Sequence, residues 1–371
     1  MPMFFLFCRC LGIHSIRISI YFAFAFACAI FVVCPSSPKL HSCFACPAAP
    51  PSRHISMPMV RSLTMHPLVA AAVLPHGDFV YDPSLLKSDD EARTKAKNLQ
   101  TAAQETALEL RNFDLDTIIL VTPHGLSVEE DTVVYLGKCG SGFAEIGRDV
   151  TDGKAEPYIV PCKDVRLDEL GNVLWKDLRN QGCAITGLTS FGGYEDVPFR
   201  YGEIIPLSFV RHSLDNKERN RDGSKKKDPS CIIISLPNRR YEHGSEMVGE
   251  MVEFGSKLYE SLGHIFATKR VGVLVSADLA HTHAEDGPYG FSPAADPFDT
   301  ACGEWAKKLD EKPLLHDARE LLDDAKSCGY LGLVILHGLL NQERDSWECQ
   351  VREISYPTYY GMMVSSFIRR F

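Results

Sequence analysis

Five short apolar runs between residues 68 and 276 constrain the fold of this chain more than any other feature. They are rich in valine, isoleucine, leucine and alanine, and polar residues do not alternate through them. Strands that are covered on both faces read this way, whereas half-exposed strands alternate. The runs are residues 68–74, 117–121, 184–189, 231–236 and 271–276. The sequence therefore predicts a sheet buried between two layers.

Helical patterns separate and follow these runs. A helix is predicted over 88–112, where Ser88 and Glu91 have capping-box spacing, and another carries Met247, Met251 and Phe254 on one face. Asp296 before Pro297 predicts the N-cap of a further helix. Two helices are expected near 314–326 and 329–340, and two strands at 348–354 and 361–367. This order predicts an α/β fold, a single domain with a central, mostly parallel sheet flanked by helices.

The charges divide the chain into two parts. Residues 1–57 hold four of the 39 basic residues, none of the 48 acidic ones, and six of the 13 cysteines. Residues 58–371 therefore carry 35 basic and 48 acidic residues, a net charge of −13. An acidic domain argues against nucleic acid as the main partner, because phosphate binding needs a basic face. We expect a domain over 58–371, interrupted by a charged, solvated loop at 215–229.

The first 57 residues have the order of a targeting segment. Arg9 and Arg17 precede an apolar run over 18–34, and a Pro/Ser/Ala-rich stretch follows. This order is typical of a secretory signal or signal anchor, and the lack of acid also suits an organellar transit peptide. Contact with a membrane is expected only through 18–34, if that run is retained. Alternatively, translation begins at Met57 or Met59, and the protein is cytoplasmic.

Histidines follow three of the apolar runs closely. His76 comes after 68–74, His124 after 117–121, and His281 and His283 after 271–276. In an open α/β sheet, ligands bind at the carboxyl ends of the strands, so we expect these histidines to converge on one edge. Neutral imidazole is the commonest protein ligand for metals. The placement predicts a metal or catalytic site without naming the metal.

Several longer segments support a family resemblance. They are PHGDF (75–79), TPHG (122–125), YGEIIPLSF (201–209), SADLAH (276–281) with DGPYGF (286–291), SCGYLGLVILHGLL (327–340) and YYGMMVSSF (359–367). In this order and spacing, the chain resembles the LigB-like class III extradiol ring-cleavage dioxygenases and the related Memo-like proteins. The resemblance runs through most of residues 68–367.

The resemblance implies roles for particular residues. His76 and His124 match the two histidines that bind non-haem iron, and His281 matches the acid/base histidine beside the metal. The dioxygenases supply a glutamate where this chain has Ser327, whereas Memo-like proteins have a cysteine in the site, which Cys328 matches. Asp323 and Asp324 are alternative carboxylates. A second departure is at 200–202, where Arg-Tyr-Gly stands in place of the Asp-His-Gly of many relatives.

The implied cofactor is Fe(II), with copper or zinc as alternatives, because a cysteine ligand favours softer metals. The implied function is extradiol cleavage of a catechol-type dihydroxy-aromatic by O2. The alternative is a Memo-like metal-binding protein without oxygenase activity, in redox or signalling and peptide binding. A general metal-dependent hydrolase is a third hypothesis. His283, Tyr289 and Tyr359 are candidate pocket residues, and assembly into a homo-oligomer is left open.

Overall fold

The predicted sheet is present and has eight strands. A computed structural model describes residues 65–370 except 88, 148–155, 194 and 212–227. The strand order is β10-β11-β1-β9-β2-β8-β3-β6. The strands are β1 (Leu68–Leu74), β2 (Thr117–Thr122), β3 (Thr132–Leu136), β6 (Ile185–Thr189), β8 (Ser230–Ser235), β9 (Val271–Ser276), β10 (Trp347–Ser355) and β11 (Met362–Arg369). Each of the five apolar runs is therefore a strand, within one residue of its predicted bounds, and both C-terminal strands are confirmed.

The four central strands of the sheet are parallel, and the strands on either side join them in antiparallel orientation. Strands β1, β9, β2 and β8 run parallel to one another, as do β3 and β6. By contrast, β3 is antiparallel to β8, β11 to β1, and β10 to β11. The prediction of a mostly parallel sheet thus holds for the middle four strands, whereas the whole sheet is mixed. The antiparallel flank arises because β10 and β11 form a hairpin, which needs no crossover helix.

Alternate residues of the central strands face two separate cores. In β1, Ala71 and Val73 pack in one core, whereas Ala70, Ala72 and Leu74 pack in the other. All seven residues of β1 are buried. This two-sided burial explains why the runs do not alternate with polar residues.

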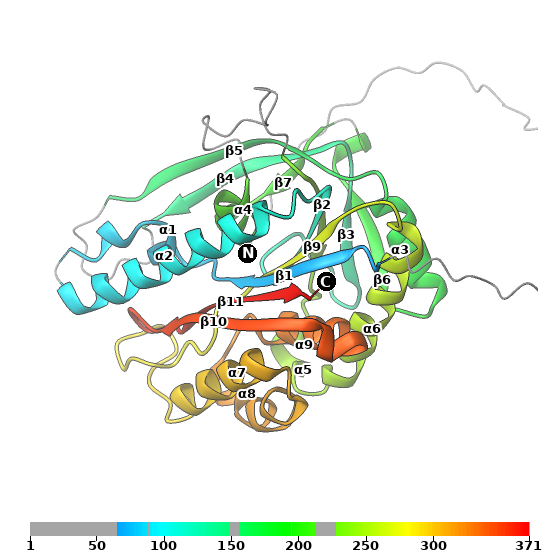
Figure 1. The fold of residues 1–371 in the computed structure, drawn as a ribbon. Helices are drawn as coiled ribbons and strands as arrows, with labels where there is room; N and C mark the ends of the chain where they lie inside the picture. The colour runs from blue at the N-terminus through cyan, green and yellow to red at the C-terminus, as the bar shows by residue number, and fades with distance from the viewer. Residues whose placement is uncertain (1–64, 88, 148–155, 194, 212–227, 371) are drawn as a thin grey trace, which may run out of the picture. The chain divides into compact units, whose positions relative to one another are not determined.

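Nine α-helices lie in the part of the chain that the structure describes. Figure 1 shows α2 and α4 on one side of β1 and β11, and α7 to α9 on the other. The helices are α1 (Asp78–Tyr81), α2 (Asp90–Arg111), α3 (Gly171–Asn180), α4 (Tyr201–Val210), α5 (Arg240–His243), α6 (Val248–Ile265), α7 (Ala295–Lys308), α8 (Arg319–Ala325) and α9 (Tyr330–Leu340). A π-helical turn, Pro313–Ala318, precedes α8.

A second, three-stranded sheet was not predicted. Its order is β5-β4-β7, formed by β5 (Tyr158–Arg166), β4 (Cys139–Ile146) and β7 (Val197–Phe199). It is half exposed, and β4 contains two glycines that weaken its strand signal. Gly142 has a tertiary reason, since a Cβ there would lie 2.1 Å from the Phe199 carbonyl oxygen.

The N-cap residues of α2 and α7 differ from those that the sequence predicts. The N-cap of α2 is Asp89, whose carboxylate accepts a hydrogen bond of 2.9 Å from the Ala92 backbone N–H, and Ser88 lies outside the described residues. The prediction for Asp296 is wrong, because α7 begins at Ala295 and Asp296 lies inside its first turn. Its side chain contacts His283 instead.

Two sequence predictions fall on residues that the structure does not describe. The targeting segment lies within 1–64, and most of the charged loop lies within 212–227. Among the residues it does describe, no helix is long and apolar enough to cross a membrane.

A buried ionic network joins the strands at the edge where β2 and β8 begin. Asp168 Oδ2 accepts hydrogen bonds from Thr117 Oγ1 (2.6 Å), Ser230 Oγ (2.6 Å) and Lys269 Nζ (2.8 Å). Burial raises the pKa of Asp168, but these donors outweigh it and bring the pKa down to about 2. The charged carboxylate therefore stabilises the fold at neutral pH.

We predict that Asp168→Asn lowers the free energy of unfolding by about 2 kcal/mol at pH 7. Because the pKa is depressed, this stabilisation exists above the unfolded value near 3.8 and disappears as the pH falls towards 2. Urea unfolding of both proteins between pH 7 and pH 3 measures the difference. The control is Asp317→Asn, which breaks an exposed pair with Lys312 and should change the free energy of unfolding far less. A difference independent of pH would contradict the assignment.

Candidate metal centre

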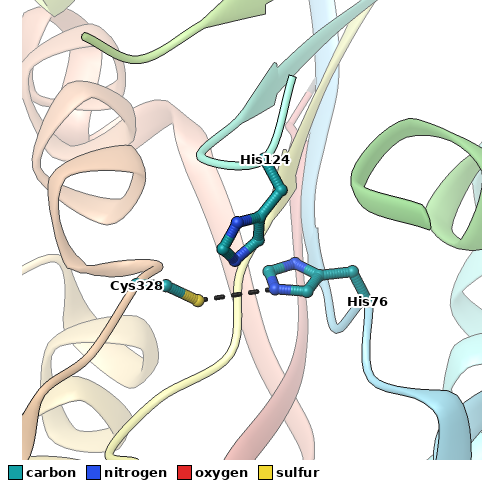
Figure 2. Close-up of side chains that lie close together, drawn as sticks. All are labelled: His76, His124 and Cys328. Carbon is teal, nitrogen blue, oxygen red and sulfur yellow. Dashed lines mark hydrogen bonds between the residues drawn. The ribbon is translucent and has the colours of Figure 1, made fainter. Parts of the chain in front are cut away.

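The histidines that follow β1 and β2 meet at one edge of the sheet, as expected from their placement. Strands β1, β9 and β2 are adjacent and parallel, so their carboxyl ends lie side by side. The rings of His76 and His124 are edge to face, with centroids 4.7 Å apart. Figure 2 shows both rings directed towards Cys328. Potential ligand atoms of these three residues all lie within 4.8 Å of one another.

Cys328 reaches the site from the turn between α8 and α9. Its Sγ lies 3.4 Å from His76 Nε2. Burial raises the pKa of the Cys328 thiol well above its usual range, the nearby Asp278 raises it further, and Arg240 opposes both effects. The thiol is therefore protonated when nothing replaces its proton, and a metal ion that binds it must displace that proton.

Both histidines are held in the neutral form. Burial lowers the pKa of His76 well below its usual value, and the neighbouring His124 and His281 lower it further. Burial also lowers the pKa of His124 to about 3, with Arg240 and His281 acting in the same direction. Neutral imidazole is the form that binds metal, so neither ring needs to lose a proton first.

Asp278 is a member of this site that the sequence analysis did not assign. Its Oδ2 lies 3.2 Å from His76 Nε2, and its Oδ1 accepts a hydrogen bond from the His76 backbone N–H. Burial raises the pKa of Asp278 to about 8, although backbone N–H groups of His76 and Gly77 lower it. The raised pKa of Asp278 and the lowered pKa of His76 both disfavour an ion pair at this contact. The available signal was its position in the SADLAH segment, three residues before His281.

His281 presents one ring nitrogen that makes no hydrogen bond to the described protein residues. Its Nδ1 lies 2.8 Å from the Leu279 carbonyl oxygen, and because a carbonyl can only accept, Nδ1 carries the hydrogen. The Nε2 lone pair is then available. Burial lowers the pKa of His281 to about 4, so the ring is neutral and can accept a proton.

A cavity of about 710 Å³ opens over these groups. His76, His124, Asp278 and His281 line it. Tyr289 and Tyr359 also line it, as the sequence analysis expected for pocket residues, together with Arg200 and Tyr201. The Tyr201 ring centroid lies 5.1 Å from that of His124 and 5.9 Å from that of His76. A tyrosine therefore lies beside both histidines.

A second, smaller chamber of about 190 Å³ adjoins Cys328. His124, His281 and Tyr289 line both cavities, whereas Cys328 and Arg240 line only the smaller one. Arg240 is fixed there by hydrogen bonds to the carbonyl groups of Leu236 and Pro237. The candidate ligands can thus be approached from two sides.

The expectation that His283 lines the substrate pocket is wrong. The side chain is 2% exposed and lines neither of the cavities beside the site. Its Nε2 lies 2.9 Å from Asp299 Oδ2, its Nδ1 lies 3.3 Å from Asp296 Oδ1, and its ring stacks on Tyr356. Strand-end placement could not distinguish it from His281, because both residues follow β9 directly and only their contacts differ.

The position expected for a glutamate carries no carboxylate. Ser327 donates a hydrogen bond of 3.1 Å to the Asp278 carbonyl oxygen. Asp323 lines the smaller chamber, but neither it nor Asp324 belongs to the group of three potential ligands. The third member of the group of potential ligands is therefore a thiol.

Comparisons with known proteins give similarity without a function. No protein-family model matches the chain. Protein CA_C1420 of Clostridium acetobutylicum is 22% identical over 300 residues, which cover 78% of this chain and 56% of that protein. The chain thus spans about half the length of this curated relative. The crystal structure of the uncharacterized protein JW3007 from Escherichia coli K12 has a TM-score of 0.41 and 16% identity, covering 80% of this chain and 99% of that one.

We predict that Gly202→Ala destabilises the protein. Gly202 is the second residue of α4, and a Cβ there would lie 2.7 Å from His124 Cβ and 2.8 Å from Thr122 Oγ1. Such overpacking costs about 1–3 kcal/mol. The control is Gly249→Ala at the second position of α6, where a Cβ would meet nothing within 4 Å. Thermal unfolding should show a loss for Gly202→Ala and none for Gly249→Ala; equal effects would contradict the crowding.

Proposed function

We propose that this chain is a Memo-like metal-binding protein of redox type, in which His76, His124 and Cys328 hold one ion. The observation that carries the proposal is the convergence of two imidazoles and one thiol within 4.8 Å. The motifs that resemble LigB-like and Memo-like proteins agree with it, and we propose that the fold is of that type. Because the potential ligand that groups with both histidines is a thiol, the Memo-like alternative is favoured over the dioxygenase.

The donor set suits a metal in its chemistry, and the separation of Cys328 from His76 matches that of two ligands of one ion. Ligands at about 2.0 Å (nitrogen) and 2.3 Å (sulfur) from a tetrahedral ion are separated by about 3.5 Å. The Sγ of Cys328 lies 3.4 Å from His76 Nε2. Nitrogen and sulfur donors suit copper(I), zinc and iron(II), and the thiolate shifts the preference towards copper(I).

The protein's own groups define what the site does. A bound copper or iron ion would supply one-electron chemistry at the floor of the larger cavity. His76 and His124 bind without losing a proton, whereas Cys328 releases one from Sγ. The carboxyl group of Asp278 lies within 3.2 Å of His76 Nε2 and has a pKa of about 8, so it can hold a proton beside the ligands.

We predict that the purified protein binds about one copper(I) or divalent ion per chain and that His76→Ala with His124→Ala abolishes this. Elemental analysis after dialysis against each metal measures the content. The control is His243→Ala with His264→Ala, since both are exposed and lie outside the site. Unchanged metal content in the His76/His124 variant would refute the site.

A second variant tests the contribution of sulfur. Cys328→Ser removes the soft donor, so copper(I) affinity should fall by at least tenfold while zinc or iron binding through the histidines changes less. Competition titration against a copper(I) chelator gives the affinity. The control is Cys302→Ser, a buried cysteine outside the group. Equal losses for all three metals would mean that Cys328 is not selective.

Extradiol ring cleavage is the second candidate function, and the neutral His281 at the cavity floor favours it. A catechol-type diol fits a cavity walled by tyrosines. His281 Nε2 could take the proton of one hydroxyl group, and both atoms of O2 would enter the product. This chemistry needs Fe(II) and a cosubstrate, and its residues are the same histidines.

For this candidate, we predict that His281→Gln removes oxygen uptake on a catechol panel and leaves the metal content unchanged. The reason is that His281 acts on the substrate proton and is not among the three potential ligands. Oxygen-electrode assays of the iron-loaded protein measure it. Absence of oxygen uptake by the unaltered protein would leave only the non-oxygenase function, and loss of metal would make His281 a ligand.

A further inference from the structure

We propose that Ser276 is a positioning residue that fixes the ring tautomer of His76, so that Nε2 is the atom presented to a metal ion. The inference rests on the proposed metal-binding function. Ser276 is the last residue of β9 and is fully buried. Its hydroxyl group lies 2.9 Å from His76 Nδ1 and 2.8 Å from the Gly202 carbonyl oxygen.

The positions of the hydrogens follow from the chemistry of the three groups. A carbonyl oxygen can only accept, and a serine hydroxyl has one hydrogen. The Ser276 hydrogen is therefore donated to Gly202, and the Ser276 oxygen accepts from His76 Nδ1. A neutral imidazole has one N–H, so His76 Nε2 must carry a lone pair. This nitrogen is the one that lies 3.4 Å from Cys328 Sγ.

The Gly202 carbonyl oxygen, which accepts from Ser276, also helps to hold His124 in place. Thr122 Oγ1 donates to the Gly202 carbonyl oxygen at 3.2 Å and accepts from the His124 backbone N–H at 3.2 Å. One carbonyl group thus holds the residue that orients the His76 ring and the residue that anchors the His124 backbone. No side chain larger than a hydrogen at Gly202 would allow this approach.

A second polar group, Asp278, lies beside Nε2, with its Oδ2 3.2 Å away. The hydrogen bond that fixes the tautomer is on the other side of the ring, between Nδ1 and Ser276. Hydrogen bonds of this kind, behind a histidine ligand, fix its tautomer and orientation, and losing one typically costs 10–100-fold in metal affinity. Ser276 therefore acts through His76 without touching the ion.

The first test uses metal-free protein and does not depend on metal binding. Ring ¹⁵N chemical shifts of histidine-labelled protein report which nitrogen of His76 carries hydrogen, with the His76 signals assigned by comparison with His76→Ala. The unaltered protein should show Nδ1–H, and Ser276→Ala should shift His76 towards Nε2–H. The control is Ser365→Ala on β11, a fully buried serine whose hydroxyl has no hydrogen-bond partner among the described residues. An unchanged His76 tautomer in Ser276→Ala would overturn the proposal.

The second test measures affinity for copper(I) and zinc. Ser276→Ala should weaken binding by about 10–100-fold, Ser365→Ala should not, and Ser276→Thr should restore most of the affinity because it keeps the hydroxyl group. Unchanged affinity in Ser276→Ala would overturn the role. If the unaltered protein binds no metal, the proposed function fails, whereas the tautomer result still decides what Ser276 does to His76.

Discussion

The site depends on the carbonyl group of Gly202, which accepts hydrogen bonds from Ser276 on β9 and Thr122 on β2. Through Ser276 it orients the ring of His76, and through Thr122 it anchors the backbone of His124. The two strands lie next to each other, and the last residue of each contacts the first turn of α4. The first turn of α4 thus holds the segments that carry His76 and His124, which are distant in the sequence. The contact is sterically possible because Gly202 has no side chain.

Burial then determines the protonation of this cluster. It lowers the pKa of His76, His124 and His281 and raises that of Asp278 and Cys328. Every one of these groups is therefore neutral near pH 7 without an ion. A neutral cluster with nitrogen and sulfur donors suits a cation that brings its own charge.

The two cavities give this cluster two accessible sides. The larger has tyrosines and Arg200 on its walls, and the smaller places Arg240 near Cys328. The positive charge of Arg240 opposes the rise in the pKa of the Cys328 thiol that burial and Asp278 cause, so it favours thiolate. Lys326 lines the same smaller cavity as Arg240 and Cys328.

The sequence by itself determined the strands at the centre of the sheet. A strand that is buried on both faces is an unbroken apolar run, whichever strands lie beside it. It also placed His76, His124 and His281 at strand ends, since carboxyl ends of adjacent parallel strands share an edge. Tertiary structure alone decided the small sheet, whose strands are half exposed and glycine-containing. It also added Asp278 and Ser276, because their hydrogen-bond partners His76 and Gly202 lie more than 70 residues away in the sequence. It separated His281, which lines the cavity, from His283, whose ring packs on Asp299 and Tyr356.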